Sequence, residues 1–388
     1  MVVQCLDYIF IHNCNWWFFF LGHFHLIRDG IVEAVVKMLS CKNKIRGHKK
    51  HRCPHCHYTV TVPHTCKSRF CSSCGKMATE KWIENNYEVL PKTNYQHVTF
   101  TMPDVFWDFF WSNRHLLRLI PAIAASVLQD LAKKKKLIVG IFLMLHTFGR
   151  DLKRNVHIHL SVTLGGLTLD LRQWKNTSFK YDAMMKMWRT RIIQMLRSEF
   201  LNGNLTLPPQ FKHLNTYSQF NKMLDDNYQK KWNVHAAKAD SDHKKNIDYF
   251  ARYLKRPPLA DTRIEKYDGE YVTFNFFDHH EKKHTRKTLT VHEFIAHVIQ
   301  HIPDKHFKLI RYYGIFANRI RGTMLPIVRR MLNLKEPKTK NNTSYQSMII
   351  NEFHVDPLQC PFCKVPMYCT CVIFGESTST ILQNHKKL

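Results

Sequence analysis

The stretch Asn155-Val156-His157-Ile158-His159-Leu160-Ser161-Val162-Thr163-Leu164 decides the fold that this sequence predicts. Polar and apolar residues alternate along it, so both histidines share one face of a strand with Ser161 and Thr163. The aliphatic residues occupy the other face. We expect a β-strand that packs its aliphatic face on a core and exposes its histidine face to water. Two imidazoles two residues apart on one face lie close enough to bind one metal ion.

The His-x-His pair is by itself a weak signal. The chain contains 25 histidines, so chance alone produces several such pairs. Its common alternative is two solvated residues on a strand. The argument for a site therefore needs a second motif elsewhere in the chain.

That second motif follows in residues 246–258, where the apolar residues have helical spacing and two prolines end the helix. Tyr249 and Tyr253 lie one turn apart on the side opposite the apolar stripe. The ordinary reading is two amphipathic rings on a helix surface. Three basic neighbours favour a phosphate-containing partner instead: Arg252, Lys255 and Arg256.

The two motifs together resemble the two-tyrosine HUH site of bacterial rolling-circle insertion-sequence transposases. In this chain the site would comprise the His-hydrophobic-His pair His157 and His159 and the Tyr-x-x-x-Tyr pair Tyr249 and Tyr253. Four further stretches resemble the same family: residues 66–75, 146–152, 252–258 and 311–319. Ordered motifs of this extent are far more specific than either short motif alone.

The resemblance implies a DNA transposase that nicks and rejoins single-stranded DNA through a 5′-phosphotyrosine intermediate. His157 and His159 would bind Mg²⁺ or Mn²⁺, and Tyr249 or Tyr253 would attack the phosphate. His146 is our candidate third ligand, because it ends an apolar strand that would pair with the histidine strand. Imidazoles alone favour softer ions, so magnesium rests on the resemblance. Two alternatives stay open: a plasmid replication initiator or relaxase, and a zinc-containing DNA-binding protein without catalysis.

The charge of the chain agrees with a nucleic-acid partner. Lys plus Arg number 58 and Asp plus Glu number 30, so the formal net charge is 58 − 30 = +28. Such a surplus favours a polyanion, with DNA ahead of an anionic membrane because the basic clusters are dispersed along the chain. We expect single-stranded DNA and element ends as partners, with host replication proteins as further candidates, and no membrane. We expect the protein in the bacterial cytoplasm, at the nucleoid. The sequence leaves the oligomeric state open.

The apolar run at residues 16–21 is too short to span a bilayer, and we read no signal peptide.

Twelve cysteines with metal-type spacing indicate a reducing compartment and bound zinc rather than disulfides. Two Cys-x-x-Cys pairs predict one structural Zn²⁺ site, formed by Cys53, Cys56, Cys71 and Cys74. We read the nearby spare candidates as core or solvated residues: Cys66, His55, His57 and His64. A later group, Cys360, Cys363, Cys369 and Cys371, is either a second thiolate cluster or part of a frayed tail. In the family that this chain resembles, the N-terminal knuckle region binds DNA.

The periodicity of the chain predicts an α+β fold. We expect an HUH-type antiparallel sheet with flanking helices, preceded by a small Cys-rich zinc-binding domain and followed by a basic C-terminal region. The expected divisions are a helical segment at 1–40, the zinc-binding, DNA-binding domain at 41–90, the catalytic domain at 91–260, a basic DNA-binding region at 261–335, and a linker with a Cys-containing tail at 336–388.

Several elements follow from local pattern. We expect strands at 95–101 and 138–145, two helices within 106–131 that part near Pro121, and a helix at 182–201. Residues 217–235 read as polar and irregular. A hairpin at 271–277 and 287–291 precedes a helix with a Thr290–Glu293 capping box. Tyr312 and Tyr313 are competing nucleophiles that we expect on a helix along DNA.

Overall fold

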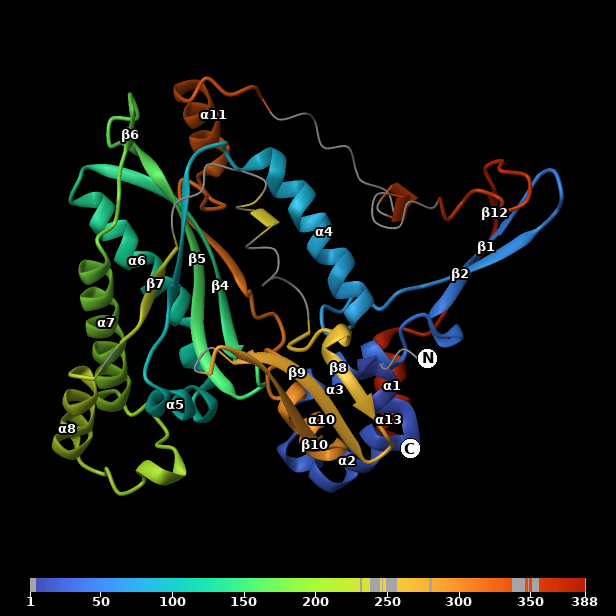
Figure 1. The fold of residues 1–388 in the computed structure, drawn as a ribbon, viewed down its shortest axis with the longest axis horizontal. Coiled ribbons are helices and arrows are strands. Elements are labelled where there is room, and N and C mark those ends of the chain that lie inside the picture. The colour runs from blue at the N-terminus through green and yellow to red at the C-terminus, as the bar shows by residue number, and fades with distance from the viewer. Residues whose placement is uncertain are drawn as a thin grey trace.

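The structure is a computed structural model, and it describes residues 5–230, 232–237, 245, 247–248, 257–278, 281–336, 346–347, 349–350 and 356–387. Its strands form three antiparallel sheets among these residues, and the helices pack around them (Figure 1). The α+β class predicted from the sequence is confirmed.

The central sheet contains the histidine strand. Its strand order is β11-β4-β5-β3-β7, with β6 paired to β5, and its strands are β3 (Tyr95–Phe100), β4 (Leu137–Phe148), β5 (Arg154–Thr168), β6 (Trp174–Asn176), β7 (Val234–Ala236) and β11 (Ile310–Gly314). β4 and β5 form the predicted long hairpin, in which His146 lies opposite His157. β3 lies on the other side of β5, with Thr99 opposite His159. The strands predicted around residues 95–101, 138–145 and 155–164 are therefore confirmed.

Helices cover the aliphatic face of this sheet. They are α5 (Trp107–Ser112), α6 (Ile120–Lys133), α7 (Tyr181–Leu201) and α8 (Tyr217–Tyr228). Val156, Ile158 and Leu160 of β5 are buried in the resulting core, so the period-two reading of that face was correct. The stretch Arg114–Lys133 is long and apolar enough to cross a membrane by length and composition alone, but half of it is buried, and α6 packs on this sheet.

Two details on this face differ from the sequence prediction. The helices within 106–131 are separated at Asn113, whose side-chain amide donates to the carbonyls of Phe109 and Thr206. Pro121 instead lies in the first turn of α6, where the backbone N–H that proline lacks would have no partner within the helix. Residues 217–228 form α8 rather than irregular structure. Thr216 and Gln219 cap that helix reciprocally, a signal that its polar composition concealed.

The opposite face of the central sheet is also covered. α4 (Ser72–Val89) and α11 (Arg321–Met331) lie over it (Figure 1). Their apolar residues bury Phe142 and Met144 of β4 in a second core. The histidine strand is thus enclosed on both sides for much of its length, although its sequence predicts one wet face.

A separate core joins the beginning of the chain to its later part. The N-terminal helices α1 (Leu6–Ile11), α2 (Asn15–His23) and α3 (Asp29–Leu39) pack with the sheet β10-β9-β8 and α10 (Val291–Ile299). The strands are β8 (Ile264–Tyr267), β9 (Tyr271–Asp278) and β10 (Lys283–Thr290). The predicted hairpin and the Thr290–Glu293 capping box are confirmed, and α10 buries Phe294, Ile295 and Val298.

β11 corrects the reading of Tyr312 and Tyr313 as helical residues. Both belong to a strand that pairs with β4, with Tyr312 opposite Phe142. The strand ends at Gly314, whose positive φ of 57° places the position of a Cβ 1.9 Å from the Val139 carbonyl oxygen. Only glycine fits there without a shift of the backbone.

The third sheet joins the two ends of the chain. β12 (Tyr368–Phe374) pairs with β1 (Gly47–Arg52), which pairs with β2 (Thr59–Pro63). The following helix, α13 (Thr378–Lys387), packs Ile381 against Val32 and Val36 of α3. In Figure 1 the red C-terminal strand lies beside the blue N-terminal hairpin, on an arm that extends away from the central sheet. Of the two alternatives that the sequence left open for this segment, a thiolate cluster or a frayed tail, the pairing of β12 and the packing of α13 contradict the frayed tail.

Candidate functional site

Three histidines meet near one end of the β4–β5 hairpin. His157 and His159 point from β5 to the same side, and His146 joins them from β4. One ring nitrogen from each lies within 4.8 Å of the other two, and the Nε2 atoms of His157 and His159 are 3.1 Å apart. The structure thus brings the expected pair and the expected third ligand together.

Hydrogen bonds set the direction in which these rings present their nitrogens. His157 uses Nδ1 to donate to the carbonyl oxygen of Asn155 at 2.9 Å, which leaves the Nε2 lone pair directed at the cluster. His159 places its Nδ1 3.3 Å from the hydroxyl of Thr99 on the neighbouring strand. Contacts of this kind to the remote nitrogen orient imidazoles that bind metals.

Burial keeps these imidazoles neutral. Desolvation lowers the pKa of His157 from 6.5 to about 4, although the bond to the Asn155 carbonyl opposes that shift. Desolvation and the neighbouring histidines also lower the pKa of His159. The prediction of a solvated face is wrong for His157, which is only 9% exposed, and for Ser161 and Thr163, which are fully buried, because the strand's sequence contains no information about the segments that pack over it. Neutral imidazoles are the form that coordinates a metal ion, so the donor set fits a divalent cation.

The proposed nucleophiles and their basic neighbours lie outside the described residues. These are Tyr249, Tyr253, Arg252, Lys255 and Arg256. The distance from the tyrosine hydroxyls to the histidines, on which the sequence argument depended, therefore stays a prediction.

The competing tyrosines have structural partners. The hydroxyl of Tyr312 accepts from Trp82 Nε1 at 2.8 Å and donates to the side-chain oxygen of Asn86 at 3.4 Å, and burial raises the pKa of this phenol. Tyr313 points to the opposite side of β11 and packs against the core under α6. Both rings therefore stabilise the attachment of β11.

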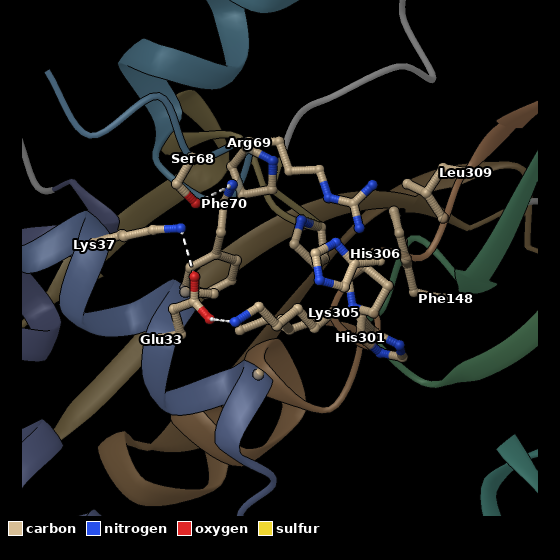
Figure 2. Close-up of a pocket in the computed structure, with 16 residues that line it drawn as sticks. Glu33, Lys37, Ser68, Arg69, Phe70, Phe148, His301, Lys305, His306 and Leu309 are labelled. Atoms are coloured by element: carbon tan, nitrogen blue, oxygen red, sulfur yellow. Dashed lines mark hydrogen bonds and ion pairs between the residues drawn. The ribbon is translucent and has the colours of Figure 1, made fainter. Parts of the chain in front are cut away.

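Two hollows lie beside the histidine cluster. One, of about 330 Å³, is lined by Phe148 (Figure 2). Phe148 stacks on His146 with ring centroids 5.0 Å apart. The other, of about 500 Å³, is lined by Met144, which lies opposite His159 in the sheet. Arg69 and Leu309 line both hollows.

Arg69 is the central cation of this region. Figure 2 shows its side chain extending from the Ser68–Phe70 loop over the first hollow toward Phe148 and Leu309. Burial lowers the pKa of its guanidinium to about 10. Among the residues that the structure describes, no carboxylate or carbonyl pairs with the Arg69 guanidinium.

Lys37 and Lys305 line the first hollow as well. The carboxylate of Glu33, which also lines that hollow, forms ion pairs with both lysines. The hollows therefore suit an anion. Our sequence analysis did not single out Arg69, although its place within Cys66–Cys74 was a usable signal.

The cysteines form two groups of four, and the sequence prediction of their partners is wrong. Cys71 and Cys74 group with Cys41 and Cys66, not with Cys53 and Cys56. The Cys74 sulfur lies 3.7 Å from that of Cys41 and 3.6 Å from that of Cys66. Spacing alone paired the two Cys-x-x-Cys motifs. The chain instead directs Cys53 and Cys56 into the β1–β2 turn, away from α4, whose N-terminus carries Cys74.

The first group is enclosed in a core. Cys66, Cys71 and Cys74 are buried among the apolar residues shared by α1, α3 and α10. Hydrogen bonds from Cys41 and Cys66 lower the pKa of the Cys71 thiol to about 6. Four converging sulfurs leave no open coordination position, which is typical of structural zinc. Cys66, which we had read as a core residue, is thus a member of the site, and Cys41 is the ligand that we missed.

Known proteins resemble the chain over most of its length. Residues 140–323 match a protein family described as "Putative transposase", and residues 15–102 match one described as "Transposase zinc-binding domain". The transposase for insertion sequence element IS801 of Pseudomonas savastanoi pv. phaseolicola is 38% identical over 355 residues, covering 90% of this chain and 85% of that protein. The protein described as "Putative transposase y4qJ" of Sinorhizobium fredii is 26% identical over 350 residues, covering 87% of this chain and 88% of that protein. No solved structure matches significantly.

Proposed function

This chain belongs to the IS91 family of rolling-circle insertion-sequence transposases, and from that premise we propose that it cleaves one DNA strand by metal-assisted attack of a tyrosine. The single observation that supports this chemistry is the histidine cluster of β4 and β5. One ring nitrogen from each of the three histidines lies within 4.8 Å of the other two. The remote nitrogen of each β5 histidine has its own partner: the Asn155 carbonyl for His157 and the Thr99 hydroxyl for His159.

A divalent cation, Mg²⁺ or Mn²⁺, held by His146, His157 and His159 would polarise a non-bridging oxygen of the scissile phosphate. The protein contributes the arrangement of the ligands. Asn155 and Thr99 fix the rings before substrate arrives, so little reorganisation is needed during the reaction. Burial keeps the rings unprotonated at neutral pH.

We assign the nucleophile to Tyr249 or Tyr253. The phenol gives its proton to solvent, its oxygen forms a bond to phosphorus, and the bond from phosphorus to the 3′ oxygen breaks, so that the departing 3′ oxygen takes up a proton from solvent. The products are a 5′-phosphotyrosine and a strand that ends in a 3′-hydroxyl. Because the phosphotyrosine conserves the phosphodiester bond, a 3′-hydroxyl of another strand can later displace the tyrosine without an external energy source. Two tyrosines would allow one chain to hold two strand ends in turn.

We propose that single-stranded DNA reaches this site along the two hollows. Arg69 lies in both, and a guanidinium without an acceptor among the described residues suits a phosphate. Phe148 offers an aromatic ring between the first hollow and His146. The N-terminal region and the net charge of +28 would add contacts to flanking DNA and to the element ends.

A covalent-adduct assay tests this proposal. The full chain is incubated with single-stranded DNA and Mn²⁺, and the products are separated on a denaturing gel. We expect an adduct that disappears in the Tyr249→Phe, Tyr253→Phe double variant and persists in the matched control Tyr217→Phe, which changes an exposed tyrosine on α8.

Two results would contradict the proposal. If no adduct forms with any divalent ion, the chain binds DNA without cleaving it. An adduct that persists in the double variant would assign the nucleophile to another residue.

A further inference from the structure

The two ends of the chain contain the same local structure. Cys53-Pro54-His55-Cys56 lies between Arg52 and Thr59, which pair as the ends of β1 and β2, and Cys360-Pro361-Phe362-Cys363 lies between Gln359 and Pro366, which form an isolated antiparallel β-bridge. Each motif therefore begins one residue after its pair and ends three residues before its partner.

The hydrogen bonds of the two turns also correspond. The N–H of Cys53 donates to the Tyr58 carbonyl at 2.8 Å, and that of Cys360 donates to the Val365 carbonyl at 2.9 Å. The residue after the second cysteine has a left-handed backbone in both turns, with φ of 62° at His57 and 58° at Lys364. Non-glycine residues rarely adopt that conformation, so its occurrence at both equivalent positions indicates two turns built for one purpose.

The turns face each other across the arm. Their four sulfurs lie within 4.8 Å of one another, and those of Cys56 and Cys360 are 3.6 Å apart. Cys53 and Cys360 are fully buried, with Met367 and Val60 packed beside them. The rings of Tyr58 and Phe362 meet edge to face at 5.1 Å.

We propose that Cys53, Cys56, Cys360 and Cys363 bind a second Zn²⁺ ion, which fastens the C-terminal segment to the N-terminal hairpin. Four thiolates from two Cys-x-x-Cys turns form the tetrahedral set that zinc prefers, and they leave no position for substrate. The matched zinc-binding domain ends at residue 102 and so includes half of this site. Cys369 and Cys371, which the sequence had grouped with the C-terminal turn, are exposed on β12 and belong to neither group.

The exposure of β12 explains why such a site would matter. All seven of its residues are exposed, including Phe374 at 85%, and the strand pairs on one side with β1. An exposed strand paired on one side has little burial to hold it. The zinc site would close the turn directly before β12 and so fix the strand beside β1.

Zinc content measured on the full chain tests the proposal. The protein is purified without a metal-binding tag, and bound zinc is measured by mass spectrometry of the element. We expect the Cys360→Ser, Cys363→Ser double variant to contain one zinc ion fewer per chain than the unaltered protein. The matched Cys369→Ser, Cys371→Ser variant should retain the full content. Equal zinc in all three proteins would overturn the proposal.

Alkylation of the unaltered protein gives a second readout that does not depend on a variant folding. Cys56, Cys369 and Cys371 are all exposed, so an alkylating reagent should reach the thiols of all three when none of them binds zinc. We expect Cys369 and Cys371 to react at once, and Cys56 to react only after a chelator removes zinc. Reaction of Cys56 as fast as that of Cys369 before chelation would refute the site.

Discussion

The Nε2 atoms of His157 and His159 lie 3.1 Å apart. The two histidines alternate along β5 with aliphatic residues whose side chains are buried on the other face of the strand. At this distance two neutral acceptor nitrogens repel each other unless a proton or a cation lies between them. Because His157 donates its Nδ1–H to the Asn155 carbonyl, its Nε2 is an acceptor, and either the Nε2–H of a neutral His159 or a cation can lie between the two nitrogens. A cation takes that place only when His159 carries its proton on Nδ1, the nitrogen that lies 3.3 Å from the Thr99 hydroxyl.

Replacing His157 should remove one ligand of that cation. We expect His157→Gln to lower the rate of strand cleavage on the order of 100-fold or more, the typical effect of losing one stabilising group at a developing charge. The measurement is single-turnover cleavage of single-stranded DNA with Mn²⁺. His235→Gln is the matched control, because His235 is exposed on β7. Equal loss of activity in the two variants would show that the effect is not specific to the cluster.

Thr99 should act as a positioning residue through His159. The Thr99→Val variant keeps the shape of the side chain but removes the hydroxyl that lies 3.3 Å from His159 Nδ1. We expect Mn²⁺ affinity to fall by about 10- to 100-fold, as is usual when the orienting partner of a ligand is lost. Titration calorimetry measures this affinity directly. Thr99→Ser, which retains the hydroxyl, should restore it, and failure of that rescue would contradict the role.

Arg69 should contribute one phosphate contact. We expect Arg69→Gln to weaken binding of single-stranded DNA uniformly across sequences and to reduce the slope of log affinity against log salt by about one. Fluorescence anisotropy at several salt concentrations gives the slope. Arg172→Gln is the control, since Arg172 is exposed in the turn before β6 and lines neither hollow. An unchanged slope for Arg69→Gln would exclude the contact.

His301 should make stability depend on pH. Its Nε2–H donates to the Leu152 carbonyl at 3.0 Å, and burial lowers its pKa from 6.5 to about 4. Between these values the unfolded chain binds a proton that the folded chain does not, so the free energy of unfolding falls as pH decreases through this window. Above pH 6.5 the full contribution is present. In urea unfolding series, His301→Gln should reduce the slope near the middle of the window by up to about 1.4 kcal/mol per pH unit. Identical slopes would contradict this.

Much of the fold was predictable because its signals are local. The alternation along residues 155–164 and the apolar run before His146 predicted the β4–β5 hairpin, since strand period depends on the neighbouring residues alone. Thr290 and Glu293 predicted the start of α10 for the same reason. The convergence of the three histidines followed because strand pairing places His146 opposite His157.

The tertiary structure decided what those signals do not contain. Which cysteines share a site depends on how the chain directs its turns, and spacing along the sequence cannot show that Cys53 faces Cys360 or that Cys74 faces Cys41. The burial of Phe142 and Met144 of β4 depends on α4 and α11, which lie far from them in sequence. By itself the sequence determined most of the elements, the alternation of the two faces of β5 and the residue types at the site, because these follow from local geometry. The partners of each face followed only from packing between distant segments.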